Sequence, residues 1–497
     1  MCPCPMCSLA MRSLAMRSLA MRPRPKLTSM AVAAGLAACL TGCAVGPDYK
    51  RPALDAPAAF RFDARDARDT ANTAWWQQFQ DPELDRLIGI ALAENKDVQV
   101  AAARIDQFLG QYGTTRSLLF PQVGAGLSGQ RQRNAFGQPV PGASTGVIEA
   151  YSLDLSVSWE IDIFGRRRRE TEAARALLLA SEEGRRATIL TLVSTVASSY
   201  VALRQLDRQL EISQETARTR RGSFELFRDR FQGGIVSELE LSQAKSDYEA
   251  ALVAIPPLES QIAQAEDALA VLLGRNPGPI RRGAALVHLK LPPVPAGLPS
   301  QLIERRPDLR QAEQQLVAAN AQIGVARAQY FPVISLTGLF GAASNVFSGL
   351  FKGANKAGTY GGGATMPVFT AGGIAGSVQT AEAAQREALL RYQQAIQIAF
   401  REVADSLIAH AKAREQLGYQ DTQIATLRNY LELAQLRYDN GYTSYIEVLD
   451  AERNLFDAEV AQTQTMSNVY VSLVNLYKAM GGGWVAQAER LVPAGAQ

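Results

Sequence analysis

The sequence contains the same turn twice, 207 residues apart. Residues 230–244, RFQGGIVSELELSQA, return as residues 437–451, RYDNGYTSYIEVLDA. Each copy places a glycine suited to the left-handed end of a helix, Gly234 or Gly441, before a serine suited to capping the next helix. These serines are Ser237 and Ser444. Amphipathic sequence flanks both turns, so each copy predicts a helical hairpin.

The duplication extends over most of the chain. A shift of 207 residues aligns Ile189 with Ile396, and a shift of 211 aligns Phe120-Pro121 with Phe331-Pro332. The four-residue difference between the two shifts places an insertion or deletion between these regions. The chain therefore consists of two tandem copies of one unit.

Long stretches without proline predict long helices. Residues 166–231 contain no proline and space their apolar residues by three and four, as coiled coils do. At about 1.5 Å per residue such a helix would be roughly 100 Å long, about three times the hydrocarbon thickness of a bilayer. The expected helices are 166–231 with its return 237–273, and 373–438 with its return 444–480.

The proline-rich segment 276–304 interrupts the helical pattern between the two copies. A helix near 308–330 follows it, and helices of 37 and 23 residues would together equal a long one. We therefore expect 308–330 to stack end to end on 237–273, with 276–304 as a belt partway along the helices. Residues 72–105 are expected to be mostly helical.

Each copy also contains two segments that alternate like β-strands. Between residues 151 and 160, large apolar side chains alternate with Ser152, Asp154 and other polar residues. The expected strands are about 122–130, 150–161, 333–341 and 360–369. Strands of about ten residues suit a tilted transmembrane barrel, whose smallest forms have about eight strands. One chain with four strands cannot close a barrel, so membrane-spanning strands would require two, three or four chains.

The N-terminus has the features of a lipoprotein signal. An apolar run at 30–40 follows a basic segment and is too short to span a bilayer, but it suits a signal peptide. It ends in Leu40-Thr41-Gly42-Cys43, which matches the bacterial lipobox. We expect the residues before Cys43 to be removed, with translation beginning at Met16, Met21 or later within 1–42, and Cys43 to become an acylated N-terminus. Stable anchoring needs two or more acyl chains, which this modification supplies, so the segment 43–71 would be anchored to the membrane.

Charge and composition exclude several functions. Residues 1–42 hold five of the 51 bases and no acids, so the remaining chain has 46 bases against 48 acids. This balance argues against a nucleic-acid partner. The four arginines 166–169 are interpreted as a solvated junction near lipid headgroups, because no aromatic residues interleave them.

No pattern for catalysis or metal binding stands out. The chain has two histidines and lacks a Ser-His-Asp, metal or paired-carboxylate constellation, so we expect neither an enzyme nor a cofactor. His410 continues an apolar helical stripe, and His288 lies alone in the proline-rich segment, so a metal site is not expected. Residues 124–129, GAGLSG, spell a dinucleotide fingerprint, but they lie on an expected strand and open no helix.

Several stretches together resemble the TolC-type outer-membrane efflux channels, the outer membrane factor family, and specifically its NodT-like lipoprotein branch. The matching stretches are CAVGPDYKRP at 43–52, Trp75-Trp76 through Asp81-Pro82, WEIDIFG at 159–165, GLPS through ERRPD at 297–308, Phe331-Pro332 and the turn at Gly441. The residue after Cys43 is Ala44 rather than Asp, which by resemblance to sorted lipoproteins favours the outer membrane. The resemblance covers about residues 43 to 485.

The resemblance implies a mainly α-helical fold with a transmembrane β-barrel. Its repeats would be 72–275 and 305–482, joined by the equatorial segment 276–304 and followed by the tail 483–497. Three chains would form a homotrimer with a 12-stranded barrel in the outer membrane of a Gram-negative bacterium. This barrel would continue into a long α-helical barrel across the periplasm.

The resemblance further implies a passive export channel. Such channels dock onto a periplasmic adaptor and an inner-membrane pump, usually of the resistance-nodulation-division type. The sequence leaves the cargo open among antibiotics, metal ions, siderophores and solvents. It also leaves open a type I protein secretion channel, and a lipid-anchored coiled-coil adaptor without a pore.

The family's gate residues carry over to the second turn. Glu447 and Asp450 would form acidic rings that close the periplasmic tip, and Tyr438 would reach Glu240 near the first turn. Close carboxylates from three chains would attract cations and respond to pH. The alternative is that these acids form a solvated helix face.

Two positions depart from the pattern of the family's gate. Gln243 replaces the acid of Asp450 in the first copy, and Thr443 stands where some members carry a basic latch residue. Gly234 with Ser237 and Gly441 with Ser444 would be the turns that contact the adaptor.

Overall fold

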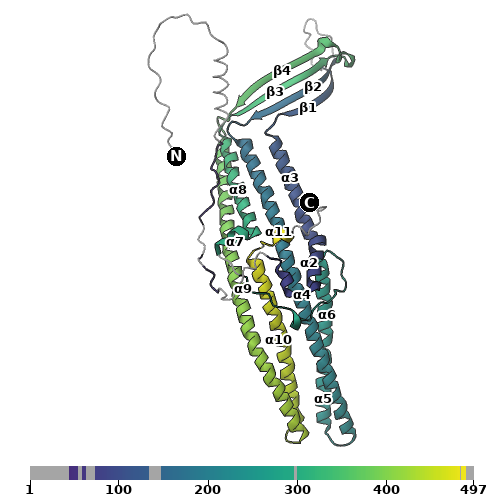
Figure 1. The fold of residues 1–497 in the computed structure, drawn as a ribbon. Coiled ribbons are helices and arrows are strands. Elements are labelled where there is room, and N and C mark those ends of the chain that lie inside the picture. Colours follow the sequence, from purple (N-terminus) through teal and green to yellow (C-terminus); the bar gives the residue numbers. More distant parts are fainter. Residues whose placement is uncertain are drawn as a thin grey trace.

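The computed structural model describes residues 44–53, 57, 59–62, 73–133, 147–295, 299–481 and 483–488. It is an elongated molecule with a four-stranded sheet at one end and two helical hairpins at the other (Figure 1). The expected signal peptide, the expected lipidation site Cys43 and most of the expected tail lie outside the described residues. Those expectations stay predictions.

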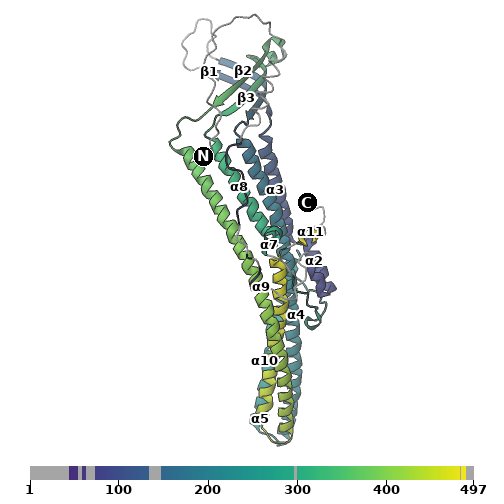
Figure 2. The same cartoon turned by 60° about the vertical axis from the view of Figure 1, so that its left-hand side comes forward.

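Two helices, α4 (Arg166–Gln232) and α9 (Gly373–Asp439), contain 67 residues each and run from the sheet to the hairpin tips (Figure 2). Each follows a glycine in the left-handed conformation, Gly165 or Gly372. By length and composition α4 is the one described helix that could cross a membrane, but 56% of its apolar window is buried. It is therefore a core helix of the rod.

The return from α4 is two helices, so the expectation of one helix over 237–273 is wrong. These are α5 (Glu238–Val253) and α6 (Ile255–Leu272), which meet at Ala254. Pro256 and Pro257 open α6. Proline lacks a backbone N–H and clashes with the preceding helical turn, so the ladder of hydrogen bonds breaks here. The return from α9 has no proline and forms the single helix α10 (Tyr445–Ala479).

The end-to-end stacking of helices also differs from the expectation. α3 (Lys96–Ser117) meets the end of α6, where Asn95 Nδ2 donates to Leu272 O at 2.9 Å. α8 (Pro307–Ala328) meets the end of α10, where Arg306 Nη1 donates to Ala479 O at 3.2 Å. Each repeat therefore stacks its own two shorter helices, and the predicted stacking of 308–330 on 237–273 is wrong.

Glycines make these two joints possible. Gly274 and Gly481 end α6 and α10 with φ of +73° and +75°. At both positions a Cβ atom would clash with the opposing helix end, at Glu94 O or at Arg306. The sequence shift of 207 residues that pairs these glycines thus marks two equivalent joints.

The sheet has the order β1-β2-β3-β4, with every neighbouring pair antiparallel. Its strands are β1 (Gln122–Arg133), β2 (Val147–Ile161), β3 (Val333–Ser344) and β4 (Lys356–Thr365). The last expected strand, 360–369, is wrong at its end, because β4 stops before Pro367. Proline cannot donate to a strand ladder.

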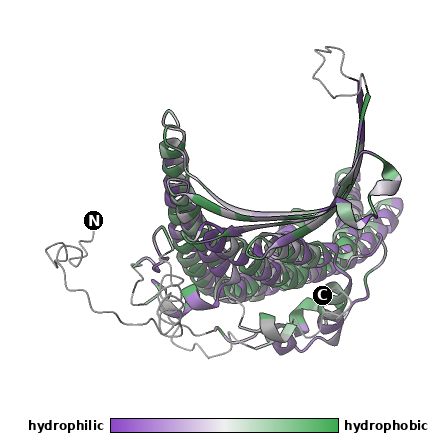
Figure 3. Ribbon diagram, turned by 90° about the horizontal axis from the view of Figure 1, so that it is seen from above, coloured by the Kyte–Doolittle hydropathy of each residue, from purple (hydrophilic) through white to green (hydrophobic). Residues whose placement is uncertain are grey.

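The sheet has the apolar and the polar face that its alternation predicts. Leu155 pairs with Ala125 on β1 and with Phe340 on β3, so large apolar side chains share one face. Asp154 pairs with Gly126 and Gly341 on the other face. The sheet is curved (Figure 3). Both outer strands, β1 and β4, have a neighbour on one side only, and every residue of β4 is exposed.

A belt of short elements packs around the middle of the rod. They are η1 (Trp75–Phe79), α2 (Pro82–Glu94), η2 (Leu286–His288), α7 (Pro299–Arg305) and α11 (Val485–Ala488), while η3 (Phe347–Gly349) and η4 (Gly353–Asn355) lie between β3 and β4. Trp75 stacks on Tyr477 with 5.2 Å between ring centroids. Asp81 accepts from Tyr200 Oη at 2.7 Å and from Ala284 N at 3.0 Å. These contacts tie the segment after α6 to the long helix α4.

Candidate functional site

The two hairpin tips have the same backbone. Ile235 N donates to Arg230 O, and Tyr442 N donates to Arg437 O, both at 2.9 Å. Gly234 and Gly441 both have φ of +73°. A Cβ atom at either glycine would meet nothing within 4 Å. Glycine is therefore required for its backbone conformation and not for space.

Each tip also presents two apolar side chains to solvent, which the sequence reasoning missed. Ile235 and Leu239 are 76% and 67% exposed in the first tip, and Tyr442 and Ile446 are 79% and 57% exposed in the second. They occupy equivalent positions, because both pairs differ by 207 residues. The signal in the sequence was an apolar residue directly after the turn glycine in both copies.

In the first tip, a capping box formed by Ser237 and Glu240 stabilises the N-terminus of the return helix α5. Glu240 N donates to Ser237 Oγ at 3.3 Å, and Ser237 N donates to Glu240 Oε2 at 2.8 Å. Both groups would otherwise be unpaired donors at a helix start. Ser237 and Glu240 therefore serve the helix α5 itself.

The second tip has the same Ser-x-x-Glu spacing without the capping box. Ser444 is the residue before α10, and its side chain makes no capping hydrogen bond. Glu447 Oε1 instead accepts from Arg437 Nη1 at 3.5 Å. Its Oε2 atom is buried and has no hydrogen-bond partner among the described residues.

Tyr438 lies between the two hairpins but does not make the expected hydrogen bond to Glu240 within the described chain. Its hydroxyl accepts from Arg230 Nη1 at 3.3 Å. Burial raises the pKa of Tyr438, the charge of Arg230 opposes that rise, and the nearby charge of Glu240 adds to it. The structure thus brings Tyr438 and Glu240 near each other, with Arg230 as the residue that the sequence reasoning missed.

Asp450 is exposed near the second tip, as an acid of a gate would be. It accepts from Asn454 Nδ2 at 3.0 Å and from Tyr430 Oη at 3.4 Å. Its counterpart in the first hairpin is Gln243, so one hairpin carries this negative charge and the other does not.

Aromatic and charged contacts hold the two hairpins together above the tips. Phe227 of α4 packs on Tyr445 of α10 with ring centroids 4.2 Å apart. Asp247 of α5 is buried, and it pairs with Arg220 Nε at 2.8 Å and with Arg453 Nε at 3.1 Å. Because these contacts join α4, α5 and α10, the hairpins form one packed unit in this structure.

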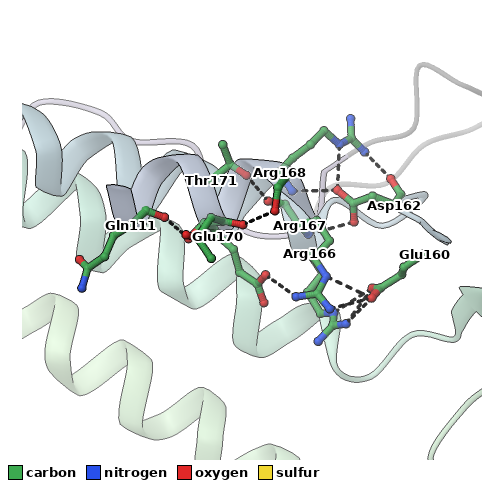
Figure 4. A network of polar contacts seen from close by, with 11 residues as sticks. Gln111, Glu160, Asp162, Arg166, Arg167, Arg168, Glu170 and Thr171 are labelled. Carbon is green, nitrogen blue, oxygen red and sulfur yellow. Dashed lines mark hydrogen bonds and ion pairs between the residues drawn. The ribbon is translucent and has the colours of Figure 1, made fainter. Parts of the chain in front are cut away.

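The junction between β2 and α4 holds the four arginines 166–169. Figure 4 shows Arg166, Arg167 and Arg168 with Glu160 and Asp162. Arg166 and Arg167 both pair with Glu160, at 2.7 and 2.9 Å. Arg168 pairs with Asp162, whose carboxylate also accepts from the backbone N–H groups of Arg167 and Arg168. Carboxylates at this position also satisfy the first N–H groups of the helix.

The run therefore lies at a strand-to-helix junction, as interpreted, but all four arginines pair with acids, and the expectation that the run is solvated is wrong for Arg169. Arg169 is 5% exposed and pairs with Asp48 at 2.6 Å and with Glu172 at 2.8 Å. The sequence contained the acids Glu160 and Asp162 next to the run, but only the fold placed them on it.

The segment after Cys43 docks beside this junction. Ala44 lies against Gly165, where a Cβ atom would clash, and Val45 N donates to Phe164 O at 3.0 Å. Asn320 Nδ2 of α8 donates to Pro47 O at 2.9 Å. The first described residues are thus fixed at the level where the sheet meets the helices.

The two histidines lie in different parts of the fold, His410 between two long helices and His288 in a short helical turn. His410 is 4% exposed, and its Nδ1 atom lies 3.1 Å from Val469 O, so it packs in the seam between α9 and α10. Burial lowers the pKa of His410. His288 lies in η2. Among the described residues, no group of three or more potential ligands from His, Cys, Asp and Glu could hold a metal ion.

Comparisons with known proteins agree with this architecture. The family model described as "Outer membrane efflux protein" matches residues 87–275 and 298–482, one segment for each repeat. The chain is 38% identical over 471 residues to the probable efflux pump outer membrane protein TtgC of Pseudomonas putida, covering 93% of this chain and 96% of that protein. It is 36% identical over 458 residues to the cation efflux system protein CusC of Escherichia coli, covering 90% and 98%.

Solved structures give the same result. The outer membrane channel CmeC of Campylobacter jejuni has a TM-score of 0.84 at 26% identity, over 92% of this chain and 100% of that chain. The open state of the MtrE outer membrane channel of Neisseria gonorrhoeae has a TM-score of 0.79 at 31% identity, over 89% and 99%. With both repeats matched across nearly their whole length, this chain belongs to the outer membrane efflux protein family.

Proposed function

We propose that three copies of this chain form an outer-membrane export channel, with the sheets closed into a barrel and the helices forming a duct below it. The observation that carries the proposal is the four-stranded sheet with two unpaired edges, β1 and β4. Backbone groups at such edges have no partner in lipid, so a sheet in a bilayer must close on itself. Pairing of β4 with β1 of the next copy would provide that closure.

The sheet supports the membrane location. Its outward side chains include Leu127, Leu155 and Phe340, which are exposed in a single chain and suit contact with lipid. The lipid-anchored adaptor without a pore would leave this apolar face unexplained. Lipidation of Cys43 would add an anchor at the junction, because Ala44 is fixed beside Gly165.

The channel would work as part of a three-component export system. TtgC carries the name of an efflux pump outer membrane protein and CusC that of a cation efflux protein. By analogy, small molecules would reach this channel from an inner-membrane pump of the resistance-nodulation-division type through a periplasmic adaptor. The channel would perform no chemistry on them, and the pump would choose the cargo.

The hairpin tips would contact the adaptor and close the channel. Their exposed apolar residues, Ile235 and Leu239 in one tip and Tyr442 and Ile446 in the other, offer six apolar pairs in a trimer. Asp450 and Glu447 would form the acidic gate. Three copies would bring like charges close, so the gate would favour cations and would relax when one acid is removed.

Planar-bilayer conductance of the purified full-length protein tests the channel and the gate together. Native protein should give small cation-selective openings. Asp450→Ala should give larger openings with weaker cation selectivity, because it removes a negative charge from each chain. Gln243→Ala is the matched control, since it changes the equivalent position of the first hairpin, and should leave both properties unchanged.

Folded, trimeric protein without any conductance would refute the channel. Equal conductance of native protein and Asp450→Ala would keep the channel and remove Asp450 from the gate.

A further inference from the structure

We propose that a groove between α3, α4 and α8 binds small amphiphilic anions, with Arg185 recognising the negative charge. The groove has a volume of about 880 Å³. Arg185 and Thr188 line it from α4, Arg104 and Phe108 from α3, and Gln311 from α8. It lies apart from the hairpin tips and from the arginine cluster at the junction.

Arg185 is the residue that points to a ligand. Its Nε and Nη2 atoms are buried and make no hydrogen bond with any described residue. The next residue on the helix, Arg186, pairs with Glu183 at 2.7 Å. Burying guanidinium donors without an acceptor costs free energy, so a ligand that supplies acceptors here would be stabilised.

The rest of the groove defines the ligand class. Arg104 adds a second positive charge, and Asp97 is the acid among the lining residues. Phe108, Leu177 and other apolar side chains form much of the remaining wall. A carboxylate can accept two parallel hydrogen bonds from one guanidinium. A small molecule with one carboxylate and an apolar body therefore fits both parts of the groove.

The groove would face the duct, and this part of the inference rests on the proposed function. Thr191 lines the groove about 200° around α4 from Ile189, which is buried in the core that includes α2, while Arg185 lies at the edge of the groove about 40° from Ile189. In the structure α2 and α11 lie to one side of the long helices (Figure 2). Three copies of these extra helices would not fit inside a narrow ring, so they would lie outside it.

The position along the rod argues against a lipid headgroup as the ligand. Arg185 follows the start of α4 at Arg166 by 19 residues, which corresponds to roughly 30 Å of helix. The junction with the sheet, at the membrane surface, is therefore too far away for a headgroup to reach the groove. Dissolved cargo is the source that remains.

Benzoate is a suitable probe, and its binding to the purified trimer in lipid nanodiscs can be followed by ligand-observed NMR. Native protein should bind benzoate, while benzylamine and benzyl alcohol should not compete with it. Arg185→Gln should weaken benzoate binding about tenfold or more, because a charge-assisted bidentate contact is lost. Arg208→Gln is the matched control, since Arg208 is a half-buried arginine of the same helix whose charge pairs with Glu211 at 3.1 Å.

Three results would overturn the site: no benzoate binding to native protein, equal binding to Arg185→Gln, or equal competition by benzyl alcohol. If Arg185→Gln does not assemble, Arg185→Lys replaces it and should weaken binding less, because lysine keeps the charge without the planar fork. Unchanged affinity in Arg185→Lys would then count against the site.

Conductance measured on the same preparations separates the two proposals. A conducting trimer that does not bind benzoate would overturn the groove alone. Benzoate binding that depends on Arg185 in a trimer that does not conduct would support the groove and overturn the channel.

Discussion

The two hairpin tips share a backbone and differ in the contacts of equivalent side chains. Glu240 and Glu447 occupy the same position after the same serine. Glu240 caps its own helix, whereas Glu447 turns to Arg437 and leaves one oxygen without a partner among the described residues. The duplicated sequence therefore produces one geometry and two chemical environments.

The different contacts of Glu240 and Glu447 accompany different contacts of the arginine that precedes each turn. Arg230 and Arg437 are equivalent, but Arg230 donates to the hydroxyl of Tyr438, whose counterpart in the first hairpin is Phe231. Arg437 remains within reach of Glu447. The acid of the first tip thus caps its own helix, while Glu447 of the second tip keeps one buried carboxylate oxygen without a hydrogen-bond partner among the described residues. This comparison supports placing the gate in the second hairpin.

The largest expected effect tests what the tips share. Gly234→Val and Gly441→Val should each destabilise the tip by about 1–2 kcal/mol, because a side chain disfavours the left-handed conformation. Hydrogen exchange of the amides around each turn measures this as faster local opening. The two costs should be equal, since neither glycine has a neighbour within 4 Å of an added Cβ. A cost at one tip alone would contradict the shared geometry.

The second prediction tests how the tips differ. Ser237→Ala should cost about 1 kcal/mol in local stability, as loss of an N-cap usually does. Ser444→Ala serves as the matched variant and should cost clearly less, because Ser444 makes no capping hydrogen bond. Exchange rates in the first turns of α5 and α10 provide the measurement. Equal losses would show that both serines cap their helices in solution.

The third prediction concerns the contact between the hairpins. Tyr438→Phe removes the hydroxyl that Arg230 contacts at 3.3 Å and should cost about 0.5–1 kcal/mol in local stability. Tyr430→Phe is the control, because it removes a hydroxyl that contacts Asp450 within the second hairpin. Exchange in the last turn of α4 should respond to Tyr438→Phe and not to Tyr430→Phe. The opposite pattern would place the contact within the second hairpin.

The smallest expected effect is a pH dependence. Burial raises the pKa of Glu452, the charge of Asp247 adds to the rise and Arg220 opposes it. A carboxyl with a raised pKa destabilises the folded state when it is ionised. Glu452→Gln should therefore be more stable than native protein at neutral pH, and the difference should disappear as the pH falls from the raised pKa to the ordinary range of Glu.

Thermal unfolding of the two proteins across that pH range measures the effect. It should be small because Glu452 is only partly buried. Lys245→Gln is the control at the equivalent position of the first hairpin, where Lys245 is exposed and lies 3.8 Å from Glu249. A native protein that loses stability on acidification within this range, relative to Glu452→Gln, would reverse the assigned sign.

Much of the local structure was available in the sequence. Apolar periodicity and turn residues predicted both hairpins, the long helices and four strands, because these signals act between residues close along the chain. Pro256-Pro257 also signalled the break between α5 and α6, but the surrounding helical pattern concealed it. The acids of the proposed gate, Glu447 and Asp450, were assigned from the resemblance to the family and not from periodicity.

The tertiary structure decided which distant parts meet. Asn95 and Leu272 form a helix joint across 177 residues, and Arg230 and Tyr438 meet across 208. Local periodicity contains no information about such partners, since each helix end offers the same unpaired backbone groups to any neighbour. The sequence by itself determined the elements and their duplication. The fold alone determined the order of stacking, the pairing of the four arginines and the lack of a hydrogen-bond partner for Arg185 Nε and Nη2 among the described residues, because these depend on packing between segments far apart in the chain.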